Sequence, residues 1–213
     1  MSDSSRSSLF RIGLLIELGL VGLAALLGWL ALGEPFPFEL RWDARDLLWS
    51  AAASVPLCAL AVFLTSPGGR RFRAFGKIYE KLREVLGEPL RRFGLIEILL
   101  LSAAAGVGEE ILFRGTVQPL LGLWVTSAIF GILHALTPAY FVLAAVMGCY
   151  LGWLAGLTGN LLVPILVHFL YDAVALWILR HHYAKDAAAE AAAGPAPVPS
   201  TGPGIEEPVE PPH

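Results

Sequence analysis

Long apolar stretches, separated by short polar ones, recur along the chain from residue 9 to residue 179. A helix needs about 20 apolar residues to cross a bilayer, and most of these stretches reach or approach that length. They predict six membrane-spanning helices, at Leu9–Leu32, Leu47–Thr65, Leu95–Gly115, Leu120–Leu136, Ala139–Leu157 and Leu161–Leu179. Turn-forming residues mark the breaks between the later spans, at Pro119, at Thr137-Pro138 and at Thr158-Gly159-Asn160. Asn160 is expected to cap the last helix.

The composition agrees with a membrane protein. Of the 213 residues, 56% are hydrophobic and 15% are charged, whereas soluble domains have about 45–50% apolar and 25% charged residues. Cys58 and Cys149 both fall within apolar spans, which argues against a disulfide and against a metal cluster. The first stretch is too long for a signal-peptide core, so we expect it to be retained. We predict an all-α, polytopic membrane helical bundle.

The orientation follows from the charges of the loops. Basic residues outnumber acidic ones between the second and third spans, at Arg70, Arg71, Arg73, Lys77, Lys81, Arg83, Arg91 and Arg92. The positive-inside rule places this loop in the cytoplasm, and six spans then place both termini there as well. The short loops and single domain are typical of a bacterial protein. We therefore expect an integral protein of the bacterial inner (cytoplasmic) membrane.

The same basic loop has helical periodicity. Apolar residues recur at spacings of three and four, at Phe72, Phe75, Tyr79, Leu82 and Leu86. This pattern favours an amphipathic helix on the membrane surface, with its cations near anionic headgroups. The alternative is a soluble helix that covers the cytoplasmic face of the bundle.

The chain divides into four parts. Residues 1–66 hold the first two spans, 67–93 the basic amphipathic segment, 94–183 the membrane core, and 184–213 an Ala/Pro-rich tail. The tail lacks an apolar pattern and is expected to be disordered. Small residues recur every four positions in the fifth span, at Gly148, Gly152 and Gly156. Such a stripe allows close helix contact, within the bundle by preference or in a dimer, so monomer and dimer both stay open.

Ionisable residues interrupt the later spans. They are Glu109, Glu110, Arg114, His134, His168 and Asp172. A charged side chain at the centre of a membrane helix costs about 2.5–3.5 kcal/mol, so intramembrane ionisable residues usually mark a functional site. A buried Glu–Arg pair or a lone histidine is often only structural, but six polar groups from separate spans favour a site. Glu17 is alone in the first span, and we expect it to pack or to snorkel.

Helical spacing relates several of these residues. Glu110 and Arg114 are four apart and can form an ion pair, while Glu109 points about 100° away from Glu110. The two carboxylates therefore have different surroundings. Gly106 and Gly108 directly precede the pair, and they would let a neighbouring helix or a substrate backbone come close.

The last two spans bring further polar groups. His168 and Asp172 are four apart and share a helix face. If every span crosses fully, His134 lies closer to the cytoplasm than Glu109 and His168 do. For these groups to meet, a span must be tilted or broken, or the span limits must differ from those above.

Three short motifs resemble those of a known family. They are Glu109-Glu110-Ile-Leu-Phe-Arg114, Phe130-Gly-Ile-Leu-His134 and His168-Phe-Leu-Tyr-Asp172. Their order and spacing are similar to EExxxR, FxxxH and HxxxN of the CPBP family, the CAAX prenyl endopeptidases and bacteriocin-processing proteins, also called ABI. The resemblance covers about residues 95–180. Asp172 departs from it, because asparagine is commoner there and an ionised aspartate cannot donate a hydrogen bond.

The resemblance implies an intramembrane endopeptidase. Glu109 would be the base that activates water, and His134 would share that water. Glu110 and Arg114 would hold the geometry. His168, with Asp172 orienting it, would stabilise the tetrahedral oxyanion.

The resemblance also bears on cofactors and partners. No cofactor is expected, although Glu109, His134 and His168 are a donor set that zinc can use. The expected partners are a membrane-anchored protein or peptide substrate and a bilayer with anionic headgroups, and nucleic acid is not among them. Two other functions stay open: a catalytically idle binding or immunity protein, and an ion-coupled transporter. A transporter would be expected to show internal repeats, and the sequence has none.

Overall fold

The computed structural model describes residues 3–193, and this part of the chain is helical with no β-strand. The elements are α1 (Asp3–Leu32), α2 (Ala44–Thr65), α3 (Pro67–Arg70), α4 (Arg73–Leu90), α5 (Leu95–Glu110), the π-helix η1 (Ile111–Val117), α6 (Gln118–Leu133), α7 (Pro138–Thr158) and α8 (Leu162–Ala193). The predicted all-α class is confirmed.

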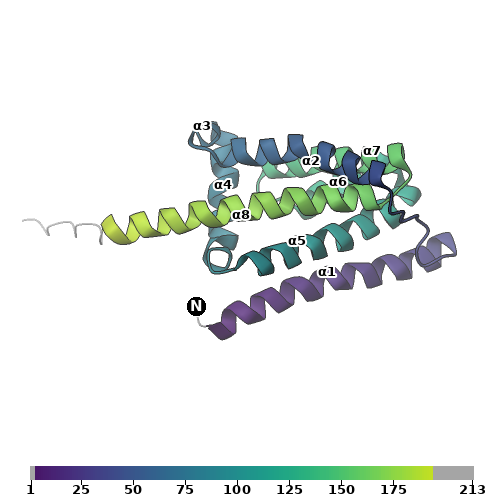
Figure 1. The fold of residues 1–213 in the computed structure, drawn as a ribbon, viewed down its shortest axis with the longest axis horizontal. Coiled ribbons are helices and arrows are strands. Elements are labelled where there is room, and N and C mark those ends of the chain that lie inside the picture. Colours follow the sequence, from purple (N-terminus) through teal and green to yellow (C-terminus); the bar gives the residue numbers. More distant parts are fainter. Residues whose placement is uncertain (1–2, 194–213) are drawn as a thin grey trace, which may run out of the picture.

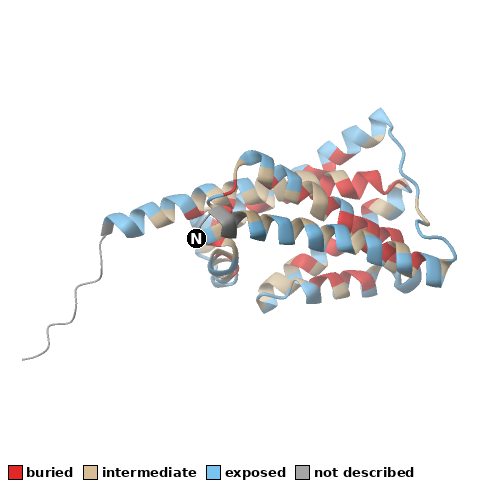
Figure 2. Cartoon of the chain, turned by 90° about the horizontal axis from the view of Figure 1, so that it is seen from below, coloured by how far each residue is buried: buried red, intermediate tan, exposed pale blue. Residues whose placement is uncertain are grey.

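The long helices lie side by side, and α4 runs across their ends (Figure 1). α8 packs against α2 and α5, α1 packs against α5, and α6 packs against α7. Both ends of the described chain lie at the same end of the bundle as α3 and α4. Buried positions line the contacts between helices, while outer faces are exposed (Figure 2).

Four helical segments in the described part are long and apolar enough to cross a membrane by themselves. They are Ser7–Leu32, Ala44–Thr65, Pro138–Thr158 and Leu162–Ala192. The sixteen residues of α5 continue through η1 into α6 without a loop. The third and fourth predicted spans therefore differ from the other four, and six full crossings stay a prediction.

The break in this region lies at Gly122. Its φ of 77° and ψ of 167° interrupt α6, and glycine adopts positive φ without the steric penalty of other residues. Pro119, which the sequence suggested as the break, lies inside the helix. The third span thus runs on to residue 121. The part of α6 that follows Gly122 is shorter, and it runs back toward the level at which the span began.

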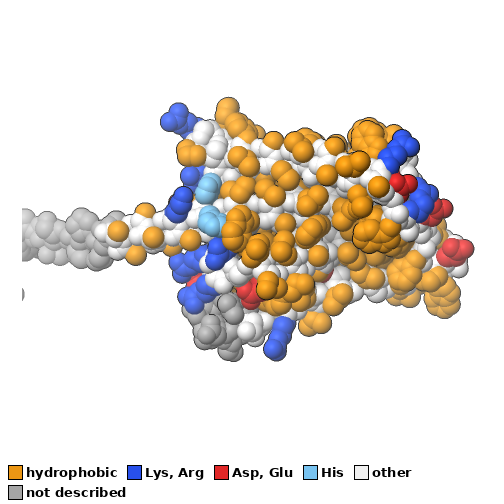
Figure 3. Space-filling view, viewed as in Figure 1, with side chains coloured by type: hydrophobic (Ala, Val, Ile, Leu, Met, Phe, Trp, Pro, Cys, Tyr) orange, Lys and Arg blue, Asp and Glu red, His pale blue; other side chains and the backbone are white. Residues whose placement is uncertain are grey.

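The surface of the bundle is suited to lipid. Apolar side chains cover its middle, and Lys and Arg gather at the end that carries α3 and α4 (Figure 3). Large apolar side chains are strongly exposed on several helices, among them Leu15, Leu18, Leu48, Val146 and Trp124. Exposed apolar area of this extent marks an interaction surface, and its position around long apolar helices makes this a membrane protein.

The apolar side of α4 packs on the chain's own bundle. Tyr79 and Leu90 are buried with Leu179 and Tyr183 of α8. The Tyr79 hydroxyl donates to Asp186 at 2.8 Å. Burial, together with this bond to a carboxylate, raises the pKa of the Tyr79 phenol above its ordinary value. The alternative interpretation, a helix that covers the end of the bundle, describes α4 better than attachment through its apolar side.

α8 is longer than the sequence suggested. It continues to Ala193, so the prediction of disorder from residue 184 is wrong for 184–193. Alanine has the highest helix propensity, and two contacts to α4 also hold this part: Asp186 with Tyr79, and Glu190 with Arg83. The rest of the predicted tail, 194–213, lies outside the described residues.

Asn160 caps α8, as predicted. Its side-chain oxygen accepts from the backbone N–H of Leu162 at 3.1 Å. Its amide nitrogen donates to Asp46 at 2.7 Å and to the Arg41 carbonyl at 2.8 Å. The buried amide therefore also ties the segment before α2 to the start of α8.

The glycine stripe of α7 packs within the bundle at two of its three positions. A Cβ on Gly148 would lie 3.3 Å from Ser127, and one on Gly152 would lie 2.3 Å from the side chain of Gln118. Nothing lies within 4 Å of a Cβ on Gly156. The preferred interpretation of the stripe, contact inside the bundle, is confirmed for Gly148 and Gly152.

Candidate active site

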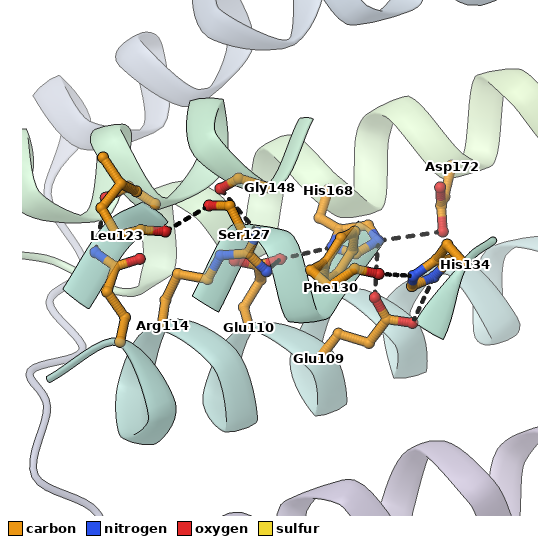
Figure 4. Close-up of polar contacts among 12 residues, drawn as sticks. Glu109, Glu110, Arg114, Leu123, Ser127, Phe130, His134, Gly148, His168 and Asp172 are labelled. Carbon is orange, nitrogen blue, oxygen red and sulfur yellow. Dashed lines mark hydrogen bonds and ion pairs between the residues drawn. The ribbon is translucent and has the colours of Figure 1, made fainter. Parts of the chain in front are cut away.

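The sequence-predicted site residues converge in one cluster (Figure 4). Glu109 and Glu110 end α5, and Arg114 lies in η1. His134 directly follows α6, and His168 and Asp172 lie in α8. The structure brings all six together, in a chain of contacts from Arg114 at one end to His134 and Asp172 at the other.

The break at Gly122 brings His134 to the level of Glu109. The chain leaves Glu109, turns at Gly122 and returns to His134, and Gly122 lies near the middle of this stretch. Because both arms are helical and of similar length, the return ends close to where the outward arm began. The depth mismatch expected from full crossings is thus removed by a broken span, one of the solutions that the sequence allowed.

Glu110 is the buried centre of the cluster. Its Oε1 accepts from Arg114 at 2.9 Å and from Nδ1 of His168 at 2.8 Å. Arg114 also donates to the Gly148 carbonyl at 3.0 Å, and its guanidinium lies 4.7 Å from the centre of the Phe130 ring. The predicted ion pair is present. It is held from three helices, so its geometry is rigid.

Glu109 faces the other way, as the helical spacing predicted. One of its oxygens lies 3.7 Å from Nε2 of His134, and the other lies 3.9 Å from Nε2 of His168. These distances are too long for direct hydrogen bonds. A bridging water is one arrangement that such distances allow.

His134 has a defined tautomer. Its Nδ1 lies 2.8 Å from the Phe130 carbonyl oxygen, and a carbonyl only accepts, so Nδ1 carries the proton. The ring also stacks on Phe130, with centroids 4.4 Å apart. Phe130 thereby fixes the orientation that turns Nε2 toward Glu109.

Asp172 is the more distant partner of His168. Its Oδ2 lies 3.5 Å from Nε2, whereas Glu110 binds Nδ1 at 2.8 Å. The carboxylate that orients the ring is therefore Glu110. Asp172 lies instead beside the nitrogen that faces the site, and its side chain keeps 25% exposure.

Three structural features of the site were missed by sequence reasoning. The π-helix η1 holds Arg114, and such wide turns occur frequently at functional sites. Its residues carry no signal that distinguishes them from an α-helix. Gln118, which donates to the Gly152 carbonyl at 3.1 Å, further ties the end of η1 to α7. The third feature is Glu17 of α1, which packs against Gly108 of α5.

Gly106 and Gly108 allow the close helix contacts that the sequence suggested. A Cβ on Gly106 would lie 2.9 Å from the Ile165 carbonyl of α8, and one on Gly108 would lie 2.5 Å from the Glu17 carbonyl of α1. α5 is therefore held tightly between α8 and α1 directly before its two glutamates.

The donor set at the site has zinc-compatible chemistry, with one carboxylate and two imidazoles. Within residues 3–193, however, no group of three or more His, Cys, Asp or Glu side chains is arranged to hold a metal ion.

An apolar cavity of about 110 Å³ reaches Asp172 from the underside of α4. Its walls come from α2, α4, α7 and α8, and they include Ala61, Phe75, Leu82, Tyr140, Tyr171 and Ala175. The cavity thus links the site to the end of the bundle where the basic residues gather.

Fold and site together define an all-helical membrane protein with a buried Glu–Arg–His cluster. Residues 91–174, which include all six site residues, match the family model of the type II CAAX prenyl endopeptidase Rce1-like proteins. The uncharacterized protein YpbD of Bacillus subtilis (strain 168) is 32% identical over 152 residues, 68% of this chain and 76% of YpbD. No solved structure gives a significant match. The chain belongs to the CPBP family of CAAX prenyl protease-like membrane proteins, and the resemblance seen in the motifs is confirmed.

Proposed function

We propose that this protein is an intramembrane endopeptidase that hydrolyses a peptide bond in a membrane-associated protein or peptide. The observation that carries the proposal is the position of Glu109 between Nε2 of His134 and Nε2 of His168, at 3.7 and 3.9 Å. A carboxylate so placed can hold a water and accept its proton. Membership of a protease family supports the same activity.

The first step is attack by water. A water between Glu109 and His134 transfers a proton to the carboxylate while its oxygen bonds to the carbonyl carbon of the substrate. When the His134 ring is neutral, Nε2 has no proton, so it can accept the second hydrogen and align the water. Glu109 then delivers its proton to the leaving amine as the C–N bond breaks.

The tetrahedral intermediate needs a donor for its oxyanion. A doubly protonated His168 can supply it from Nε2 while Nδ1 donates to Glu110. Both ring nitrogens face carboxylates, Glu110 on one side and Asp172 on the other. Arg114 balances the charge of Glu110. If zinc is bound, Glu109, His134 and His168 would hold it, and the ion would polarise the water or the carbonyl.

The substrate is proposed to be cleaved close to a membrane anchor. The apolar cavity beside Asp172 could receive an apolar part of such a substrate at the α4 end of the bundle. The basic residues at this end support a cytoplasmic location for α4 and for both termini, in a bacterial inner membrane.

Comparative proteomics of membrane and secreted fractions tests the proposal. Cells with wild-type protein are compared with cells that carry Glu109→Gln, and the matched control is Glu84→Gln on the exposed side of α4. The expected result is that at least one membrane-associated protein stays uncleaved only with Glu109→Gln. Identical cleavage patterns in all three strains would favour the idle binding protein instead.

A second experiment tests the cavity. Ala175→Trp is expected to fill it and to raise KM for the anchored protein found by proteomics, with little change in kcat. The control is Ala128→Trp, at an exposed position of α6 outside this cavity. Equal KM values for both variants would show that the substrate does not use the cavity.

A further inference from the structure

Glu17 lies against the residue that precedes Glu109. A Cβ on Gly108 would come within 2.5 Å of the Glu17 carbonyl oxygen and within 3.2 Å of its carboxylate Oε2. The close crossing of α1 and α5 therefore places both the backbone and the side chain of Glu17 at this point of the site. The packing role expected for Glu17 is thus exerted directly before the two glutamates of the site.

The carboxylate of Glu17 lies close to the site. It is within electrostatic range of Glu109, His134, His168 and Asp172. Its Oε2 is shielded from solvent and has no hydrogen-bond partner within the described residues. A shielded carboxylate oxygen without a donor costs free energy, and such groups in native proteins need an explanation.

Three of the four groups near Glu17 remain partly accessible, and only His168 among them is buried. The side chains of Glu109, His134 and Asp172 keep 13%, 29% and 25% exposure, whereas Glu110 and Arg114 keep 0% and 1%. A substrate can therefore reach the first three residues but not the buried ion pair. Glu17 interacts with the part of the cluster that the substrate must contact.

A peptide in this site brings donors that need acceptors. Within a membrane, each backbone N–H without a partner costs several kcal/mol. An extended substrate cannot satisfy these groups internally, since it forms neither a helix nor a closed sheet at the cleaved bond. A free carboxylate oxygen beside the catalytic glutamate meets this requirement.

We propose that Glu17 is a substrate-binding residue whose carboxylate accepts a hydrogen bond from a backbone N–H of the peptide next to the cleaved bond. This inference rests on the proposed peptidase function. It gives α1, which contributes nothing to the three family motifs, a direct part in the site.

Steady-state kinetics of the purified full chain in lipid nanodiscs test the inference. The probe is a quenched farnesylated peptide that ends in a C-a-a-X sequence. Glu17→Leu removes the acceptor, and we expect KM to rise about tenfold with kcat within about twofold, because a contact made equally in ground and transition states affects binding alone. Glu17→Gln keeps a carbonyl acceptor and should stay within about threefold of wild type. Ile16→Ala, at a lipid-facing neighbour, is the control.

Thermal unfolding of the same variants distinguishes a binding role of Glu17 from a structural one, because loss of a structural contact would lower the stability. Glu17→Leu should be at least as stable as wild type, because an apolar side chain is favoured in this environment. Lower stability of Glu17→Leu, or an unchanged KM, would overturn the inference. A similar loss of kcat in Glu17→Gln and Glu17→Leu would also overturn it, since a proton-carrying role would then fit better.

Binding without turnover separates this inference from the proposed function. If wild type does not cleave the peptide, the proposed function fails for this probe. Fluorescence anisotropy of the labelled peptide then decides on Glu17. Affinity about tenfold weaker for Glu17→Leu than for wild type supports the binding role, and equal or undetectable affinity in both overturns it.

Discussion

Glu110 accepts a 2.8 Å hydrogen bond from Nδ1 of His168, through the same oxygen that accepts from Arg114. Glu110, the second glutamate of the motif, therefore binds both the Arg114 guanidinium and the His168 imidazole. Of the two glutamates, Glu109 is the one that faces Nε2 of both His134 and His168. Adjacent carboxylates with such different surroundings are a frequent basis for separate roles in catalysis.

Glu109→Gln is expected to abolish cleavage while the fold is kept. Glutamine preserves the shape of the side chain but cannot accept the proton of water, and loss of a general base typically costs about 10²–10⁴ in rate. Cleavage of a defined substrate and thermal unfolding of the same preparation measure the two effects. Activity within a few-fold of wild type would refute the assignment of Glu109 as base.

Arg114→Ala is expected to reduce stability as well as activity. It leaves the buried Glu110 without its arginine partner, and removal of one partner of a buried ion pair costs about 3–5 kcal/mol. Unfolding in denaturant measures the loss. The double variant Arg114→Ala/Glu110→Gln should recover part of the stability but not the activity, because the charge is gone while His168 has lost its carboxylate. No difference between the single and double variants would argue against the charge as the cause.

Asp172→Asn is expected to stay active with an altered pH profile, and Asp172→Leu to be nearly inactive. Glu110 holds Nδ1 of His168, so the ring keeps its orientation in either variant. Asparagine can still bind near Nε2 or donate to the oxyanion itself, whereas leucine can do neither. The pH dependence of kcat/KM for both variants is the measurement.

The metal content of the purified protein tests whether Asp172 is a metal ligand. If Asn and Leu at 172 are equally inactive, the ionised carboxylate is essential and a metal-ligand role becomes the better account. Elemental analysis of purified wild type beside the Glu109 and Asp172 variants then decides. Stoichiometric zinc in wild type that is lost in both variants would replace the water-and-glutamate mechanism with a metal-dependent one.

The basic residues at the start of α4 and directly before it are expected to interact with anionic lipid. Arg71 and Arg73 are exposed, whereas Arg70 lies 4.4 Å from the centre of the Tyr79 ring. Replacing Arg71 and Arg73 with Gln should weaken the interaction by about 1 kcal/mol per charge. Hydrogen exchange of α4 in nanodiscs with and without anionic lipid measures this, and Arg70 is left unchanged because of its contact with Tyr79. Equal protection of wild type and variant in anionic nanodiscs would contradict a role at the membrane surface.

The sequence by itself determined the class, the family and the residues that meet in the cluster. Apolar stretches of membrane-spanning length allow few structures other than helices, because each backbone polar group must be satisfied within the membrane. Polar residues in such helices must meet, so the pairing of Glu110 with Arg114 could be predicted from their spacing. Local rules were sufficient here because the i,i+4 relation and the cost of isolated charge act within one helix.

Only the tertiary structure decided how separate helices share the cluster. The positive φ of Gly122 sets the level at which His134 returns, and no local rule distinguished it from Pro119. The choice of Glu110 as the partner of His168 depends on the contact between α5 and α8, which Gly106 permits. Glu17 looked isolated because its neighbour Gly108 comes from α5, far away in sequence. Such relations arise from helix packing, and packing depends on the shapes of several helices at once.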